Sequence, residues 1–176
     1  FDFYVVTEFT QKDGFRPCGY FSRYRYNLLD TNLNCICVFP CYQKHGFGRF
    51  LIDFSYQMSV ISAIPGGPER PLSDAGLVTY TSYWKRTVAI KLAKVQETDL
   101  KKLETELGMR EADIVEVIQN LFSTTTKNGE LMLNRRLVNE IAKDEQMKDR
   151  AKLYPKWACI EPGFQKYLHE LKDTIK

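Results

Sequence analysis

The sequence lacks several features that would each point to a particular class of protein. Its longest apolar stretch, around 35–39, is far shorter than the roughly 20 residues of a membrane-spanning helix, so we expect no membrane span. No basic segment followed by an apolar one opens the chain, so we expect no secretory signal. An excess of one charge is also absent, because 25 basic and 22 acidic side chains give a formal charge of +3. No basic stripe of the kind that duplex DNA selects is present, and direct sequence-specific DNA binding is not expected.

Candidate metal ligands are few. The chain has five cysteines and two histidines, and an odd number of cysteines fits a reducing compartment better than a disulfide framework. Cys35 and Cys37 share one face of a predicted strand, because alternate residues of a strand point the same way. No further pair of cysteines or histidines supplies the other ligands of a zinc site. We therefore expect no metal.

The composition is that of a globular protein, with 44% hydrophobic and 27% charged residues, and it excludes intrinsic disorder. The chain opens on a strand-like run with Phe1 in place of methionine, so we expect a piece of a longer protein. Apolar periodicity predicts strands at 3–8, 19–22 and 33–39, then helices at 48–62 and 73–95. An Ile-Pro-Gly-Gly-Pro segment breaks the chain between the two helices.

The remainder of the chain is predicted to be mainly helical. The predicted elements are a helix that Thr98 caps and Gly108 ends, a helix at 111–122, a hairpin turn at 127–130, and helices at 136–150 and 164–175. This is the outline of a winged-helix unit, which often binds DNA, but the balanced charge favours a packing module. We therefore divide the chain into a core at 1–97 and a helical, winged-helix-like segment of the same domain at 98–176.

One segment, 33–49, has the pattern of an anion site. A buried strand leads into a glycine-bearing loop that opens directly into an amphipathic helix. Such a loop exposes uncapped backbone N–H groups at the positive end of the helix dipole, which suits a pyrophosphate. Gly46 and Gly48 allow close approach of the backbone, and Lys44 and Arg49 add positive charge. An ordinary strand-to-helix connection explains the same residues, whereas the glycine spacing fits neither a Rossmann nor a Walker loop.

The spacing Gln43-x-x-Gly46-x-Gly48 after such a strand resembles the acetyl-CoA pyrophosphate loop of N-acetyltransferases. The surrounding motifs resemble, in order and spacing, the core of the MYST family of histone acetyltransferases. The motifs that carry this resemblance are Phe3-Tyr4-Val5, Gly19-Tyr20-Phe21-Ser22, Asn34-Cys35-Ile36, Tyr42 to Arg49, Leu51 to Tyr56, Pro68 to Leu77 and Ser82-Tyr83-Trp84. The resemblance implies an α/β (α+β) fold with an N-acetyltransferase-like mixed sheet and flanking helices, and it implies acetyl-CoA as the cosubstrate.

The resemblance assigns Glu69 as the general base. A lysine amine with a pKa near 10.4 is only about 0.04% neutral at pH 7, a penalty of roughly 4.6 kcal/mol. A carboxylate whose pKa is raised by partial burial can take the proton as the amine attacks, although without the motif Glu69 would be interpreted as a solvated loop carboxylate. Cys35 matches the family's active-site cysteine. It either accepts the acetyl group itself or lines the site during direct attack, and direct attack is favoured because no activating histidine is near in sequence.

The resemblance implies three sets of contacts to acetyl-CoA. The backbone of Ile36, Cys37 and Val38 would pair with the pantetheine arm, and N–H groups there would stabilise the thioester oxygen. The pyrophosphate would be held by Gln43, Lys44, His45, Gly46, Phe47, Gly48 and Arg49. Ser73 and Ser82 would contact the cofactor from the second helix, and Ser73 is also expected to cap that helix.

The implied function is acetyl transfer to lysine side chains of histone tails in the nucleus, with subunits of a chromatin-modifying complex as partners. The family's catalytic domain begins further upstream, with a zinc-binding element and strands carrying an autoacetylated lysine that this chain does not include. A non-catalytic scaffold that keeps the cofactor site therefore stays open. An acetyltransferase of non-histone or small amines is a third possibility, although the Pro-Glu-Arg-Pro-Leu-Ser-Asp stretch speaks against small amines.

Overall fold

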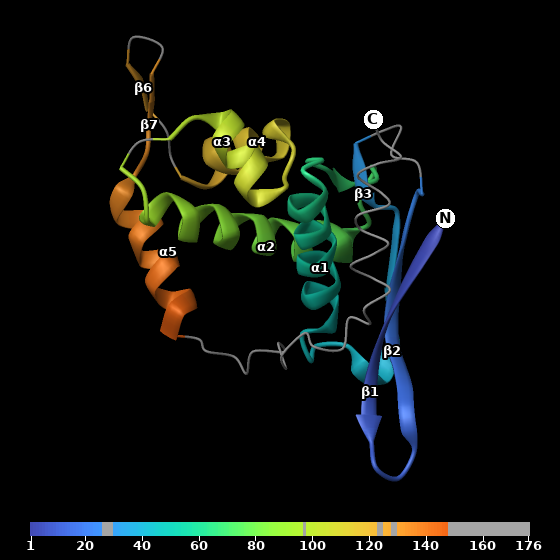
Figure 1. Cartoon of the computed structure of the whole chain (residues 1–176). Coiled ribbons are helices and arrows are strands. Elements are labelled where there is room, and N and C mark those ends of the chain that lie inside the picture. The colour runs from blue at the N-terminus through green and yellow to red at the C-terminus, as the bar shows by residue number, and fades with distance from the viewer. Residues whose placement is uncertain (26–29, 97, 123–124, 128–129, 148–176) are drawn as a thin grey trace.

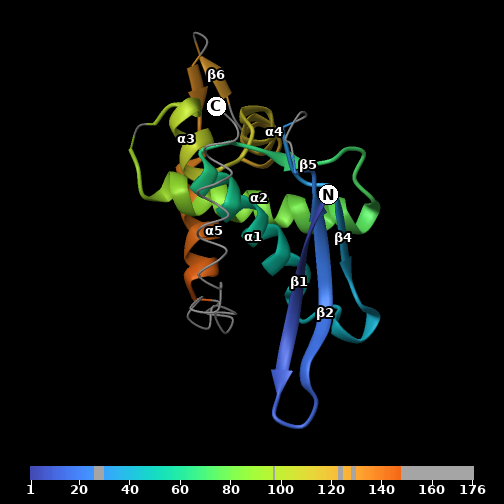
Figure 2. The ribbon, with the colours of Figure 1, turned by 45° about the vertical axis from the view of Figure 1, so that its right-hand side comes forward.

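A small sheet lies beside a group of helices (Figure 1). The computed structural model describes residues 1–25, 30–96, 98–122, 125–127 and 130–147. Three strands form an antiparallel sheet in the order β1-β2-β4, and they are β1 (Asp2–Thr10), β2 (Gly14–Arg23) and β4 (Cys35–Val38). The first two strands extend those predicted from the sequence in both directions. They form a long hairpin whose turn projects beyond the helices (Figure 2).

The run at 33–39, predicted as one strand, is divided in two, so that prediction is wrong in its extent. Thr31–Leu33 (β3) pairs in parallel with Gly67–Pro68 (β5), whereas β4 pairs antiparallel with β2. Asn34 lies at the break, and its Oδ1 accepts a hydrogen bond from the backbone N–H of Tyr24 at 2.8 Å. Asparagine side chains compete with strand ladders for backbone groups, which is why the run changes partner here. The Pro-Gly-Gly-Pro segment, predicted only as a breaker, therefore also supplies a strand.

Two long helices form the centre of the molecule. They are α1 (Phe47–Ser62) and α2 (Asp74–Ala93), and both match the predicted helices to within two residues. A short 3-10 helix, η1 (Pro40–Tyr42), connects β4 to the loop before α1. The Trp84 indole N–H donates a hydrogen bond of 2.7 Å to the Tyr56 hydroxyl, which joins α2 to α1 in the core.

The helix, helix, hairpin order predicted for the C-terminal segment is confirmed. The elements are α3 (Leu100–Leu107), α4 (Glu111–Leu121), β6 (Thr125–Lys127), β7 (Glu130–Met132) and α5 (Arg135–Met147). The predicted cap at Thr98 is wrong, because the Asp99 carboxylate accepts the Lys102 N–H at 2.7 Å and so caps α3. Gly108 ends that helix with φ 63°, as predicted. The helix predicted at 164–175 lies outside the described residues.

One hydrophobic core joins the sheet to the helices. Its largest fully buried members include Phe21, Leu33, Tyr56, Tyr80, Trp84, Met109, Ile114 and Phe122. The α+β class is confirmed, and both antiparallel and parallel strand pairing occur. The domain division after residue 97 stays a prediction. Among the helices that the structure describes, none is both long enough and apolar enough to cross a bilayer.

Candidate functional site

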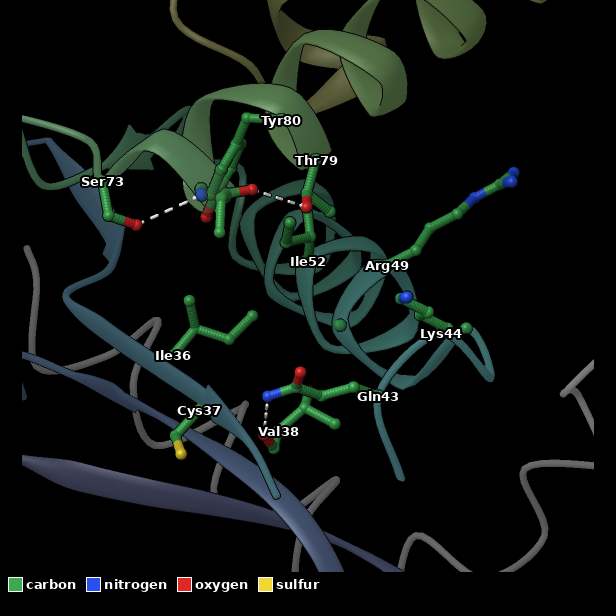
Figure 3. Close-up of a pocket in the computed structure, with 14 residues that line it drawn as sticks. Ile36, Cys37, Val38, Gln43, Lys44, Arg49, Ile52, Ser73, Thr79 and Tyr80 are labelled. Atoms are coloured by element: carbon green, nitrogen blue, oxygen red, sulfur yellow. Dashed lines mark hydrogen bonds between the residues drawn. The ribbon is translucent and has the colours of Figure 1, made fainter. Parts of the chain in front are cut away.

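A cavity of about 640 Å³ lies between β4 and the N-terminal ends of α1 and α2 (Figure 3). Nine of the residues predicted to contact a cofactor line it. They are Ile36, Cys37, Val38, Gln43, Lys44, Gly46, Gly48, Arg49 and Ser73. The fold therefore brings the strand, the glycine loop and the start of the second helix around one space.

The N-terminus of α1 lies at this cavity and carries no side-chain cap. Gly46 is the N-cap residue with φ 95°, in the left-handed region where a residue without a Cβ is favoured, and no side chain caps the helix. The first N–H groups of an α-helix have no partners within the helix, and a helix N-terminus therefore suits an anion. Lys44 adds a cationic side chain to the same wall. This end of the cavity is electropositive from both backbone and side chain.

The second helix also points its N-terminus at the cavity. The Ser73 hydroxyl accepts a hydrogen bond of 3.1 Å from the Gly76 N–H, so Ser73 is the N-cap, as the sequence predicts. Two helix dipoles therefore converge on one space, which favours a ligand with more than one anionic group. Because Ser73 serves its own helix, its oxygen is oriented before any ligand arrives.

β4 supplies the third wall. It is an edge strand of the β1-β2-β4 sheet, and among the described strands only β2 pairs with it. An edge strand offers backbone N–H and C=O groups to an extended chain that carries amides. The Gln43 side-chain amide donates to the Val38 carbonyl at 3.1 Å, which ties the loop back to the strand (Figure 3). An elongated ligand with amide groups can therefore lie along β4.

The cavity is also lined by five residues that we did not predict from the sequence. They are Ile52, Ala75, Gly76, Thr79 and Tyr80. Helical periodicity could have predicted three of them, because positions three and four apart on a helix share a face. Gly76, Thr79 and Tyr80 therefore follow from Ser73 at the start of α2. Burial raises the pKa of the Tyr80 hydroxyl above its ordinary value, and the negative charge of Asp113 adds to the effect, so the ring is a neutral wall.

Three predicted cofactor residues do not line the cavity. The Nδ1 atom of His45 lies 2.8 Å from the Gln43 carbonyl oxygen, and the Phe47 ring packs edge-on against Tyr42 with centroids 5.8 Å apart. Both side chains therefore contact residues of the loop itself. Ser82 is exposed on α2 and is not among the residues that line the cavity.

The two predicted catalytic residues lie near each other at the start of β4. Cys35 is the first residue of that strand, one position before Ile36 in the cavity wall. The Glu69 N–H donates to the Leu33 carbonyl at 2.9 Å, and its carboxylate Oε2 accepts from the Asn34 amide at 3.1 Å. Both Cys35 and Glu69 are exposed. They lie beside the cavity and do not line it, a position open to a macromolecular substrate.

The loop that carries Glu69 is anchored from the opposite side by α4. Arg70 donates to Asp113 at 3.0 Å and to Glu116 at 3.1 Å, and the hydrogen bond to Asp113 raises the pKa of the Arg70 guanidinium. Arg110 also contacts Asp113, at 3.0 Å, and donates to the Pro68 carbonyl at 3.4 Å. These contacts from α4 and its N-cap residue Arg110 therefore hold Pro68 and Arg70, the two neighbours of Glu69 in the chain.

Residues 1–158 match the model of the MOZ/SAS family. Histone acetyltransferase mst2 of Schizosaccharomyces pombe is 35% identical over 161 residues, which cover 89% of this chain and 39% of that protein. Histone acetyltransferase KAT6B of Mus musculus is 38% identical over 138 residues, covering 77% and 7%. Histone acetyltransferase MOF of Drosophila melanogaster is 38% identical over 125 residues, covering 69% and 15%. The chain thus spans less than half the length of each of these relatives.

Proposed function

The chain belongs to the MOZ/SAS family, and we propose that it forms the acetyl-CoA-binding core of a lysine acetyltransferase that acts on histone tails. The family match confirms the resemblance to MYST histone acetyltransferases stated from the sequence. One observation carries the proposal: the cavity in which the uncapped N-terminus of α1, the N-terminus of α2 and the edge of β4 meet. Its volume of about 640 Å³ falls in the range of about 300–1,000 Å³ usual for small-ligand sites.

Each wall suits one part of acetyl-CoA. The amides of residues 43–49, together with Lys44, would bind the diphosphate. The edge of β4 would pair with the amides of the pantetheine arm, as it would with a peptide strand. With acetyl-CoA in this orientation, the pantetheine arm would run along Ile36–Val38, and the thioester would lie near Cys35 and Glu69 at the start of β4.

The reaction needs a base because a lysine side chain is an ammonium ion at neutral pH. Glu69 takes a proton from that ammonium, and the freed nitrogen attacks the carbonyl carbon of the thioester. A C–N bond forms and the C–S bond breaks. Coenzyme A leaves as a thiolate, which takes up the second proton that the nitrogen loses as the amide forms. Backbone N–H groups of Ile36–Val38 would stabilise the negative charge that develops on the carbonyl oxygen. The exposure of Glu69 leaves room for the peptide that carries the lysine.

Cys35 lies beside the cavity, next to the proposed position of the thioester, and direct attack by the amine is the favoured route. A cysteine nucleophile requires an activating partner, most often a histidine. His45 has its Nδ1 next to the Gln43 carbonyl, in the loop at the far end of β4. An acetylated Cys35 is therefore not needed for turnover.

Histone tails as substrate, a nuclear location and partner subunits of a chromatin-modifying complex belong to the same proposal. Their support is that the relatives named above are histone acetyltransferases. The activity is expected of the full-length protein, of which this chain supplies the cofactor site and the base.

The test uses the full-length protein, with Glu69→Gln and, as a matched control, Glu140→Gln. Glu140 is exposed on α5, pairs with Arg136 at 3.0 Å and is not among the residues that line the cavity. Calorimetric titration with acetyl-CoA should show binding by all three proteins. Glu69→Gln should lower kcat on histone-tail peptides by about 100-fold or more, the usual contribution of a general base. Binding without turnover by the unmutated protein would instead support the scaffold, and turnover of polyamines alone would support the small-amine enzyme.

A further inference from the structure

Asn34 is placed to hold the catalytic carboxylate. It occupies the single position between β3 and β4, beside Cys35. Its Nδ2 donates to Glu69 Oε2 at 3.1 Å, across a separation of 35 residues in the sequence. Among the described residues, Asn34 supplies the one hydrogen bond recorded for that carboxylate, through Oε2, and Oε1 is left to accept a proton.

The orientation of the Asn34 side chain is fixed by its other contact. Oδ1 accepts the backbone N–H of Tyr24 at 2.8 Å, and a backbone N–H can only donate. The oxygen of the amide must therefore face Tyr24, so the NH₂ group must face Glu69. The backbone of Asn34 is held as well, since its N–H donates to the Ser22 carbonyl at 2.8 Å.

We propose that Asn34 is a positioning residue, which fixes the Glu69 carboxylate in the rotamer that accepts the lysine proton. This inference rests on the proposed role of Glu69 as the base. A free glutamate side chain samples several rotamers, and fixing it in one of them costs conformational entropy. The backbone bond from Glu69 to the Leu33 carbonyl and the side-chain bond to Asn34 together fix both ends of the residue against one short stretch of chain.

Two variants separate positioning from a merely structural role. Asn34→Asp keeps an oxygen that accepts the Tyr24 N–H, but it replaces the donor near Glu69 Oε2 by a second carboxylate oxygen, which displaces the base. Asn34→Ala loses both contacts. Both variants are expected to lower kcat about tenfold, the equivalent of about 1.4 kcal/mol, with KM for acetyl-CoA unchanged, because neither Asn34 nor Glu69 lines the cavity.

The decisive readout is the rate at two pH values, measured as initial rates with a histone-tail peptide. A lysine with a pKa near 10.4 is about 0.1% neutral at pH 7.5 and about 11% neutral at pH 9.5. At the higher pH the amine needs less help from a base, so the defects of Asn34→Asp and Glu69→Gln should both shrink. A merely structural defect would persist at both pH values.

The outcomes distinguish the inference from the function on which it rests. If Glu69→Gln shows the defect and its recovery at pH 9.5 while Asn34→Asp behaves as wild type, the positioning role is refuted and the base stands. A defect of Asn34→Asp that is the same at both pH values also refutes positioning. If Glu69→Gln has no defect at pH 7.5, the proposed base is refuted, and the role of Asn34 with it.

Discussion

Gly48→Ala should stabilise the fold and weaken the binding of acetyl-CoA. Gly48 is the second residue of α1, where alanine is more favourable than glycine by about 0.5–1 kcal/mol. A Cβ at this position would lie 3.7 Å from the Val38 Cγ2 atom, an ordinary contact that brings no clash. The free energy of unfolding is therefore expected to rise by about 0.5 kcal/mol.

The same methyl group stands in the cavity, between the first turn of α1 and β4. With acetyl-CoA bound as proposed, this methyl group would hold the diphosphate away from the helix amides. The loss of one hydrogen bond to a charged group costs about 1.5–3 kcal/mol, so the Kd for acetyl-CoA should rise by about tenfold or more. Urea denaturation measures the first effect and calorimetric titration the second.

Gly14→Ala provides a control with the opposite pattern. Gly14 has φ 68°, and a Cβ there would meet nothing within 4 Å, so the only cost is backbone strain of about 1–2 kcal/mol. It is the first residue of β2, next to the β1–β2 turn, and it does not line the cavity. Stability should fall while the Kd for acetyl-CoA stays unchanged. If Gly48→Ala binds acetyl-CoA as tightly as the wild type, the placement of the diphosphate at this loop is refuted.

Three further changes test the framework of the site. Ser73→Ala removes the N-cap of α2 and should lower the free energy of unfolding by about 1 kcal/mol in urea denaturation, whereas an unchanged value would contradict the capping role. Gly67→Ala places a Cβ 2.4 Å from Asp113 Oδ2 and 2.5 Å from Arg110 Nη2, so it should destabilise the protein by about 1–3 kcal/mol and lower kcat through the Glu69 loop. Burial raises the pKa of Tyr80 in the folded protein, so this tyrosine ionises first in the unfolded chain, from about pH 10 upward. Above that pH the free energy of unfolding should therefore fall by up to about 1.4 kcal/mol per pH unit. The slope should be shallower in Tyr80→Phe, and an identical slope would show that Tyr80 ionises freely in the folded state.

The sequence predicts the helices and the loop well because their signals are local. The apolar spacing of α1 and α2, the Ser73 cap and the Gly108 terminus are each set by residues within a few positions. The prediction that Thr98 caps α3 was wrong, because Asp99, one residue later, is also a favourable N-cap residue and is the one used. Residues close in sequence thus determine whether an element is a helix or a strand, whereas its exact first residue depends on which of several neighbouring polar residues caps it.

The parts that the sequence did not predict depend on long-range contacts. The division of the 33–39 run arises from the hydrogen bonds of Asn34 to Tyr24 and of β3 to β5, which join distant segments. The hydrogen bond between Asn34 and Glu69 likewise joins residues 35 positions apart, and no repeating pattern in the sequence predicts it. Alternation alone cannot show which strand a run pairs with. His45 and Phe47 belong to a cofactor motif in sequence, yet their side chains contact the loop itself.

The most direct measurement is an experimental structure of the full-length protein with acetyl-CoA bound. We expect the diphosphate within hydrogen-bonding distance of the backbone amides of residues 43–49, with the thioester next to Cys35 and Glu69. A diphosphate bound anywhere else on the protein would contradict it.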